Sequence, residues 1–167
     1  MNKHTVEQFL KMLTNLDGLL AKTAAHADGR KFDVNNFAAE RLAPDMLPLS
    51  KQVQIACDTA KFTVAYLSNQ TAPAFEDNET TIPELRARIQ KTSEYLKTAL
   101  DFNYTAYATA NISPKWAKGG SLTGAEYFNE VAMPNFYFHM TMVYAILRKA
   151  GVEVGKMDYL GALNFKM

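Results

Sequence analysis

Histidines, a lone cysteine and a few amide side chains are the groups through which this chain could do chemistry. His139 stands out because it lies in the most apolar stretch of the sequence, with Asn135 four residues before it. If that stretch is helical, both side chains project from one face, where an imidazole and an amide could bind a ligand. The simpler interpretation is a buried histidine whose ring nitrogens are satisfied by a neighbouring side chain.

A second polar pair, Gln54 and Asp58, is also spaced by one turn of a predicted helix. Polar pairs that face each other on two helices can build a ligand site inside a helical bundle. The apolar stripe of this helix, however, places Asp58 on the far side, which favours a solvated carboxylate. The candidate pocket comprises four residues: Gln54, Asp58, Asn135 and His139.

The remaining reactive residue types do not form a recognisable catalytic or metal motif. His4 precedes the first predicted helix and His26 lies near its end, and no two histidines have a metal-binding spacing. Cys57 lies in an apolar helical stretch, as a buried structural thiol does. The glycine-rich segment 119–124 lacks the Lys-Ser/Thr of a P-loop, and a hairpin turn followed by a helix cap explains it. We therefore expect neither a metal nor a cofactor.

Composition narrows the class of protein. The chain has 167 residues, 48% of them hydrophobic and 21% charged, which predicts a single globular domain over residues 1–167. A formal net charge of +1 provides no bulk field that would attract nucleic acid or an anionic membrane. The longest apolar zone, from Phe136 to Leu147, is too short to span a bilayer. We expect a soluble, cytoplasmic protein without a nucleic-acid or membrane partner.

Apolar residues spaced by three and four predict the helices that must position these groups. The first spans about Thr5 to Ala27, with Thr5 and Gln8 as a capping box and Asp28-Gly29 as its stop. The other three helices begin at Pro44 or Pro48, at Ile82 and after Thr123, and end near Asn69, Phe102 and Ala150.

Two features interrupt or close this helical pattern. Residues 104–121 change in composition and contain a Gly-Gly turn, which predicts a short hairpin or an extended loop between the third and fourth helices. Pro134 lies inside the fourth helix and should kink it, and Gly151 should close it.

Four helices without βαβ alternation predict an all-α four-helix bundle. The fourth helix is apolar on nearly all sides between Phe136 and Leu147, so loop segments or a second subunit must cover it. Of these two possibilities we favour a homodimer.

Five strings, in the same order along the chain, resemble a bacterial domain-of-unknown-function family, number 1993, which in turn resembles the DinB/YfiT-like four-helix bundles. The strings are RLAPDM (41–46), QVQIACD (52–58), PNFYFH (134–139), YAILR (144–148) and GKMDYLG (155–161). The resemblance covers nearly the whole chain and implies a helical bundle that is frequently dimeric.

The resemblance also implies where a metal site would lie. Metal-binding DinB-like proteins use one histidine of the second helix and an HxxxH pair of the last helix. Set against that pattern, His139 matches the final ligand, Asn135 the other member of the pair, and Gln54 the histidine of the second helix. Amides are poor ligands for zinc or nickel, so the resemblance supports the fold and argues against the metal.

These observations favour a small-molecule-binding or stress-related accessory protein with a metal-free polar pocket. Two alternatives remain open. The first is an enzyme of the thiol-transferase or isomerase type, as the resemblance implies, with His139 as acid/base. The second is an interaction module without a small ligand.

Overall fold

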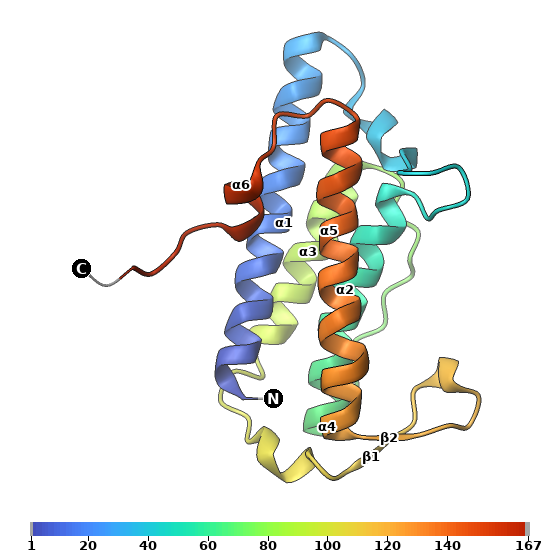
Figure 1. Ribbon diagram of the computed structural model, residues 1–167, viewed down its shortest axis with the longest axis vertical. Coiled ribbons are helices and arrows are strands. Elements are labelled where there is room, and N and C mark those ends of the chain that lie inside the picture. The colour runs from blue at the N-terminus through green and yellow to red at the C-terminus, as the bar shows by residue number, and fades with distance from the viewer. Residues whose placement is uncertain (1, 166–167) are drawn as a thin grey trace.

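Four long helices run side by side in the computed structural model, which describes residues 2–165 (Figure 1). They are α1 (Lys3–Arg30), α2 (Leu49–Ser68), α3 (Ile82–Lys97) and α5 (Met133–Lys149). α1 and α5 run in one direction, and α2 and α3 in the other (Figure 1). Each helix packs against two others, in the order α1, α3, α2, α5 and back to α1. The predicted all-α bundle is therefore confirmed.

The first helix starts and stops differently from the prediction. Asn2, not Thr5, is the N-cap, because its side chain accepts a hydrogen bond from the Thr5 N–H at 3.2 Å. Thr5 is therefore the third helical residue, and Gln8 takes no part in the cap. At the other end the helix continues past Asp28-Gly29 and ends at Lys31, which adopts a left-handed conformation with φ 60°.

The connection to the second helix contains one short 3-10 helix, η1 (Val34–Ala39). α2 begins directly after Pro48, the second of the two predicted starts, because a proline is tolerated only before or within a first turn. The helix ends at Asn69, which is left-handed with φ 53°, in agreement with the predicted end.

The third helix begins at the predicted capping box and ends early. The Thr81 hydroxyl accepts from the Glu84 N–H, and the Glu84 carboxylate accepts from the Thr81 N–H. α3 then ends at Lys97, before the predicted Phe102. At this end the Thr98 hydroxyl donates to the Tyr95 carbonyl at 2.7 Å, and the backbone continues as turns.

Residues 69–81 form a long connection because α2 and α3 run in the same direction. This segment returns along the outside of the bundle before α3 can start (Figure 1). Glu79 fastens it to α3 through the Arg88 guanidinium at 3.0 Å. Its end is fixed by Asn35 of η1, whose side-chain oxygen accepts from the Ile82 N–H at 3.0 Å.

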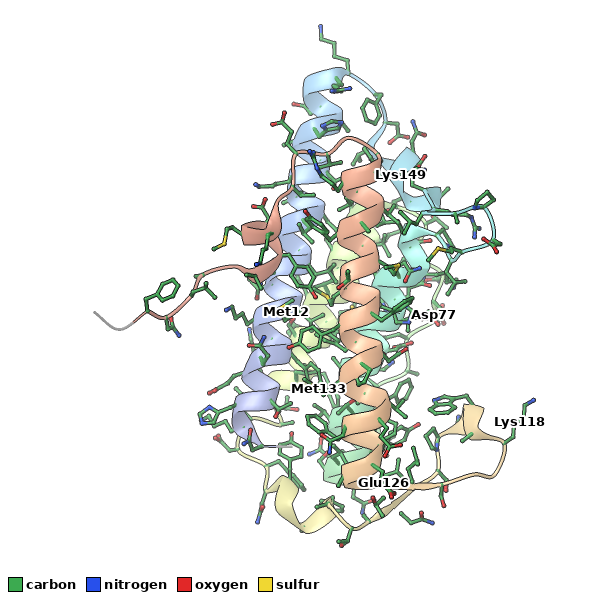
Figure 2. The ribbon with its side chains drawn as sticks, in the orientation of Figure 1. Met12, Asp77, Lys118, Glu126, Met133 and Lys149 are labelled. Atoms are coloured by element: carbon green, nitrogen blue, oxygen red, sulfur yellow. The ribbon has the colours of Figure 1, made fainter. Side chains whose placement is uncertain are left out.

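A hairpin stands out from one end of the bundle between α3 and α5 (Figure 1). A 3-10 turn, η2 (Tyr104–Tyr107), leads into β1 (Asn111–Ile112), which pairs antiparallel with β2 (Leu122–Thr123). Between the strands lies a second 3-10 turn, η3 (Lys115–Ala117). Figure 2 shows Lys118 at the tip, pointing away from the bundle. Of the short hairpin or extended loop predicted here, the structure has the hairpin.

The fourth long helix contains a wider turn where a kink was expected. The capping box of Thr123 and Glu126 opens α4 (Gly124–Glu126), and the chain then passes through a π-helix, η4 (Tyr127–Ala132), into α5. Pro134 lies directly after this π-helix and has no N–H to donate. The helix thus accommodates the proline through the wider π-helical turn before it, which contains an extra residue.

The C-terminal segment covers part of the bundle in a way that the sequence did not predict. Gly151, with φ 91°, closes α5 as expected, and the chain turns back to α6 (Lys156–Leu160), which packs on α1. Asp158 forms an ion pair with Lys22 at 2.6 Å, and the Asn15 amide donates to the Tyr159 carbonyl at 3.0 Å.

The core lies between the four long helices, and the apolar fourth helix contributes much of it. Phe136, Met140, Val143 and Leu147 are fully buried, and the Phe136 ring lies 4.7 Å from that of Phe9 in an edge-on contact. Among the described residues, no helix is both long and apolar enough to cross a membrane.

Candidate functional site

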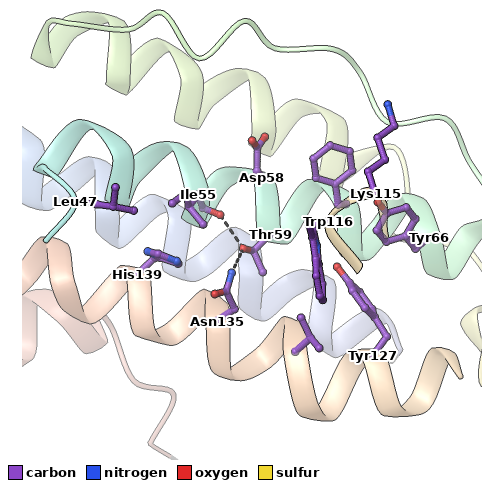
Figure 3. A pocket seen from close by; sticks show the side chains of 12 residues that line it. Leu47, Ile55, Asp58, Thr59, Tyr66, Lys115, Trp116, Tyr127, Asn135 and His139 are labelled. Carbon is purple, nitrogen blue, oxygen red and sulfur yellow. Dashed lines mark hydrogen bonds between the residues drawn. The ribbon is translucent and has the colours of Figure 1, made fainter. Parts of the chain in front are cut away.

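A cavity of about 740 Å³ lies along the seam between α2 and α5, next to the hairpin (Figure 3). We call it the α2/α5 cavity. Its apolar and aromatic walls come from seven residues: Leu47, Ile55, Phe62, Tyr66, Trp116, Tyr127 and Val131. Its polar lining includes His139 and Asn135, which project from the same face of α5 as predicted. This volume and this lining are typical of cavities that bind small molecules.

His139 is held by a side chain of the facing helix. Its Nδ1 lies 2.7 Å from Oε1 of Gln52, and both residues are buried. The Gln52 amide nitrogen donates to the Leu47 carbonyl at 3.1 Å, which fixes the amide with its oxygen toward the ring. Nδ1 must therefore carry the hydrogen, and in the neutral ring Nε2 has an open lone pair.

The protonation of this imidazole is biased by its surroundings. Burial lowers the pKa of His139 below its ordinary value of 6.5. The neutral ring, with Nδ1–H toward Gln52, is therefore the form present at neutral pH. A neutral imidazole with an accessible Nε2 can accept a hydrogen bond or a proton from a bound molecule.

Asn135 is oriented by a parallel set of contacts. Its Nδ2 donates to the Thr59 hydroxyl at 2.8 Å, and that hydroxyl donates to the Ile55 carbonyl at 2.7 Å (Figure 3). The hydroxyl hydrogen is already used, so Thr59 can only accept from Asn135. The Asn135 carbonyl oxygen and the second N–H of its amide are consequently left for a ligand.

Asp58 lines the cavity but is not solvated as the helical periodicity suggested. Its carboxylate lies 2.7 Å from the Lys61 ammonium and 2.9 Å from the Arg88 guanidinium. Asp77 and Glu79 of the long connection contact the same guanidinium. We call these five residues the Arg88 cluster. The solvated interpretation was wrong because α3 and the 69–81 connection cover this side of α2.

The Arg88 cluster keeps its charges by mutual pairing. Burial alone would lower the pKa of Arg88, but the neighbouring carboxylates of Asp58, Glu79 and Asp77 raise it above its usual value. Burial likewise acts to raise the pKa of Glu79, and hydrogen bonds, including those from Arg88 and Gln54, lower it below the usual range. The cluster thus supports the back of α2, and the Asp58 carboxylate is turned toward α3 (Figure 3).

The hairpin completes one end of the cavity. Trp116 of η3 lies beside Tyr127 there, with His139 toward the other end (Figure 3). Trp116 is 62% exposed, so this aromatic side chain stands at the boundary between cavity and solvent. Burial raises the pKa of Tyr127 to about 12, which keeps its phenol protonated at neutral pH. Neither aromatic residue was predicted to belong to the site, because both lie outside α2 and α5, in η3 and η4.

The comparisons with known proteins agree with this architecture. The family model for a domain of unknown function (DUF1993) matches residues 1–160. The chain belongs to the DUF1993 family. Among solved structures, it is similar to the crystal structure at 1.83 Å of a DinB family member protein from Shewanella denitrificans. The two are 48% identical with a TM-score of 0.89, over 97% of this chain and 92% of the other. No curated protein matches the chain.

Gln54 is the sequence-predicted site residue that the fold of this DUF1993 protein places elsewhere. Its amide donates to Glu79 at 2.8 Å on the α3 side of α2, and it does not line the α2/α5 cavity. Gln52, two residues earlier and on the opposite side of the helix, makes the contact with His139 that we expected from Gln54. A shift of two residues turns a side chain by roughly 200° around a helix.

A metal of the kind bound by three-histidine DinB-like proteins does not fit the residues present. At the cavity the DUF1993 protein offers one imidazole nitrogen and one open amide oxygen, while Thr59 is already hydrogen-bonded. Such a donor set is too poor for zinc or nickel. Within residues 2–165, no group of three or more His, Cys, Asp or Glu side chains could hold a metal ion.

The other reactive residues of the DUF1993 protein lie away from the cavity. Cys57 is fully buried on α2, and burial raises the pKa of its thiol to about 12, so a thiolate nucleophile is not available. His4 is exposed beside Glu7 at the start of α1, and the His26 ring contacts Phe32 and Phe37 at its other end.

Proposed function

We propose that this DUF1993 protein binds a small organic molecule in the α2/α5 cavity. The observation that carries the proposal is a cavity of about 740 Å³ with aromatic and aliphatic walls and two oriented polar groups, His139 and Asn135. Apolar walls provide affinity through burial, and a few fixed polar groups orient the bound molecule. A molecule with an aromatic or aliphatic body and one polar end matches this lining.

Trp116 supplies a direct readout for the test, because it is the only tryptophan of the chain and it lines the cavity. The probe is para-propylphenol, which combines an apolar body with a hydroxyl group. Titration should change the Trp116 emission in a saturable manner and raise the unfolding temperature, since a ligand that binds only the native state stabilises it. Isothermal titration calorimetry should give one site per chain.

A pair of variants shows whether binding takes place in this cavity. Val131→Phe adds a ring to the cavity wall and should weaken binding at least tenfold. Val34→Phe, in η1 and outside the cavity lining, is the matched control and should bind like the wild type. Absence of any change in Trp116 emission and unfolding temperature in the wild type would contradict the proposal.

A second candidate function, catalysis with His139 as a general base, is favoured by one specific observation. The contact with Gln52 places the hydrogen on Nδ1 and leaves Nε2 as the basic nitrogen on the cavity side. A base in this position could remove an acidic proton from a bound substrate, as an isomerase or a thiol transferase requires. This chemistry goes beyond binding and needs its own assay.

The assay for the second candidate follows hydrogen exchange in a bound carbon acid. In D₂O, the wild type should accelerate loss of the methyl proton signal of para-hydroxyacetophenone, because Nε2 takes a proton from that carbon and an enolate forms. The imidazolium exchanges this proton with D₂O and returns a deuteron to the enolate carbon, which regenerates the ketone and the neutral ring. His139→Gln should still bind the ketone but lose the acceleration. Equal exchange rates for wild type and variant would exclude His139 as the base and leave the binding proposal intact.

A further inference from the structure

Two hydrogen-bond chains lead from backbone carbonyls to the α2/α5 cavity, and each has only one possible direction. In the first, the Leu47 carbonyl accepts from Gln52 at 3.1 Å, and Gln52 accepts from Nδ1 of His139 at 2.7 Å. In the second, the Ile55 carbonyl accepts from Thr59 at 2.7 Å, and Thr59 accepts from Asn135 at 2.8 Å. A carbonyl oxygen can only accept, so the Nδ1–H of His139, the Thr59 hydroxyl and one N–H of each amide all donate along the chains toward the backbone. The second N–H of each amide is not used in these chains.

The consequence is that the first chain ends in an acceptor alone, whereas the second ends in an amide with an open oxygen and one remaining N–H. His139 presents the lone pair of Nε2, and Asn135 presents its carbonyl oxygen. The two residues are one turn apart on α5 and both line the cavity (Figure 3). Asp58 also lines the cavity, but its carboxylate is paired with Lys61 and Arg88. Lys115, a cation of the lining, belongs to the hairpin, and its ammonium points away from His139 (Figure 3).

We propose that the cavity selects neutral molecules that donate hydrogen bonds, such as alcohols, phenols and amides with N–H groups, over matched molecules that only accept. This inference rests on the proposed function, since it names the class of molecule that the same cavity takes. An acceptor-only molecule would displace water from His139 and leave the Nε2 acceptor unpaired, which is unfavourable in a buried site. An anion likewise offers only acceptors, so it would be disfavoured for the same reason.

Gln52 is the positioning residue in this scheme, because it determines which nitrogen of His139 carries the hydrogen. Replacing it with methionine removes the acceptor and allows the ring to adopt either tautomer. Gln54→Met is the matched control. It changes the same residue type to the same apolar one on the same helix, and Gln54 is equally buried, but its amide binds Glu79 instead of facing the cavity.

The experiment compares para-propylphenol with its methyl ether by isothermal titration calorimetry. The wild type should prefer the phenol about tenfold, the range expected for one hydrogen bond to a buried acceptor. Gln52→Met should reduce this preference to about twofold or less, because an Nε2–H tautomer can donate to the ether. Gln54→Met should keep the wild-type preference.

A measurement without any ligand provides the second arm. The ¹⁵N spectrum of the imidazole in the labelled wild-type protein should show His139 with a protonated Nδ1 and an unprotonated Nε2. The opposite tautomer, or a charged ring at neutral pH, would overturn the inference. Equal affinity of the wild type for phenol and ether would also overturn it while leaving the proposed function standing. Failure of both molecules to bind would overturn the proposed function and the inference together.

Discussion

The guanidinium of Arg88 on α3 lies 2.9 Å from the carboxylate of Asp58 on α2, and the arginine side chain is only 1% exposed. The same guanidinium holds Asp77 and Glu79, so one buried side chain joins α2, α3 and the connection between them. The aromatic ring of Phe75 lies 5.2 Å from it. The Arg88 cluster therefore supports the helix whose other side lines the α2/α5 cavity.

We predict that Arg88→Met lowers the free energy of unfolding by about 3 kcal/mol, because it leaves the partly buried carboxylates of Asp58 and Glu79 without the buried guanidinium that pairs with them. Equilibrium unfolding in urea measures the loss. Arg86→Met is the matched control: Arg86 pairs with Asp17, but its side chain is 38% exposed, so we expect a loss of about 1 kcal/mol or less. Equal losses for the two variants would contradict the role assigned to the cluster.

Gly124 should not tolerate a side chain. It starts α4 where the base of the hairpin meets the bundle, and a Cβ there would clash with the Tyr107 carbonyl and press on Leu67. We predict that Gly124→Ala costs about 1–3 kcal/mol of stability. Gly18→Ala, on α1 with open space around the added Cβ, should instead stabilise by about 0.5–1 kcal/mol. Thermal and urea unfolding of both variants would show whether the signs differ.

His139 should make stability depend on pH in a defined direction. Its pKa in the native state is held below 6.5 by burial, whereas the unfolded ring titrates near its ordinary value. As the pH falls through that ordinary value, the unfolded chain gains a proton that the native ring resists, so the native state loses stability. Above it, both states are neutral and the effect is absent.

The measurement compares wild type with His139→Gln, which cannot titrate at this position. The unfolding free energy of the wild type should fall relative to that of His139→Gln when the pH is lowered from about 8 to about 5. His4 and His26 are present in both proteins, so their contributions cancel. A difference that does not change with pH would show that burial has little effect on this imidazole.

A homodimer remains a prediction for this chain. α1, α2 and the C-terminal segment cover much of the apolar fourth helix, but Phe138 of α5 is still 51% exposed. An aromatic ring on an otherwise packed helix favours association with a second copy. Light scattering at micromolar concentration should give twice the mass of the chain, and Phe138→Lys should give the monomer. A monomeric wild type would refute this prediction.

Local signals in the sequence determined the helices and part of the candidate site. Apolar spacing and the capping boxes at Thr81 and Thr123 depend on neighbours within one or two turns, and these predictions were confirmed. His139 and Asn135 share a face because both belong to one helix and are separated by four residues. Even the position of the hairpin followed from a local change in composition.

Tertiary structure alone decided which side of α2 faces α5. Gln52 and Gln54 are both buried on opposite sides of this helix, so its apolar pattern does not show which glutamine meets His139. Asp58 has the spacing of a solvated residue, yet α3 packs over it and supplies Arg88. Periodicity relates a side chain only to its own helix axis. The partner that covers each face is set by how the long connections return the chain across the bundle.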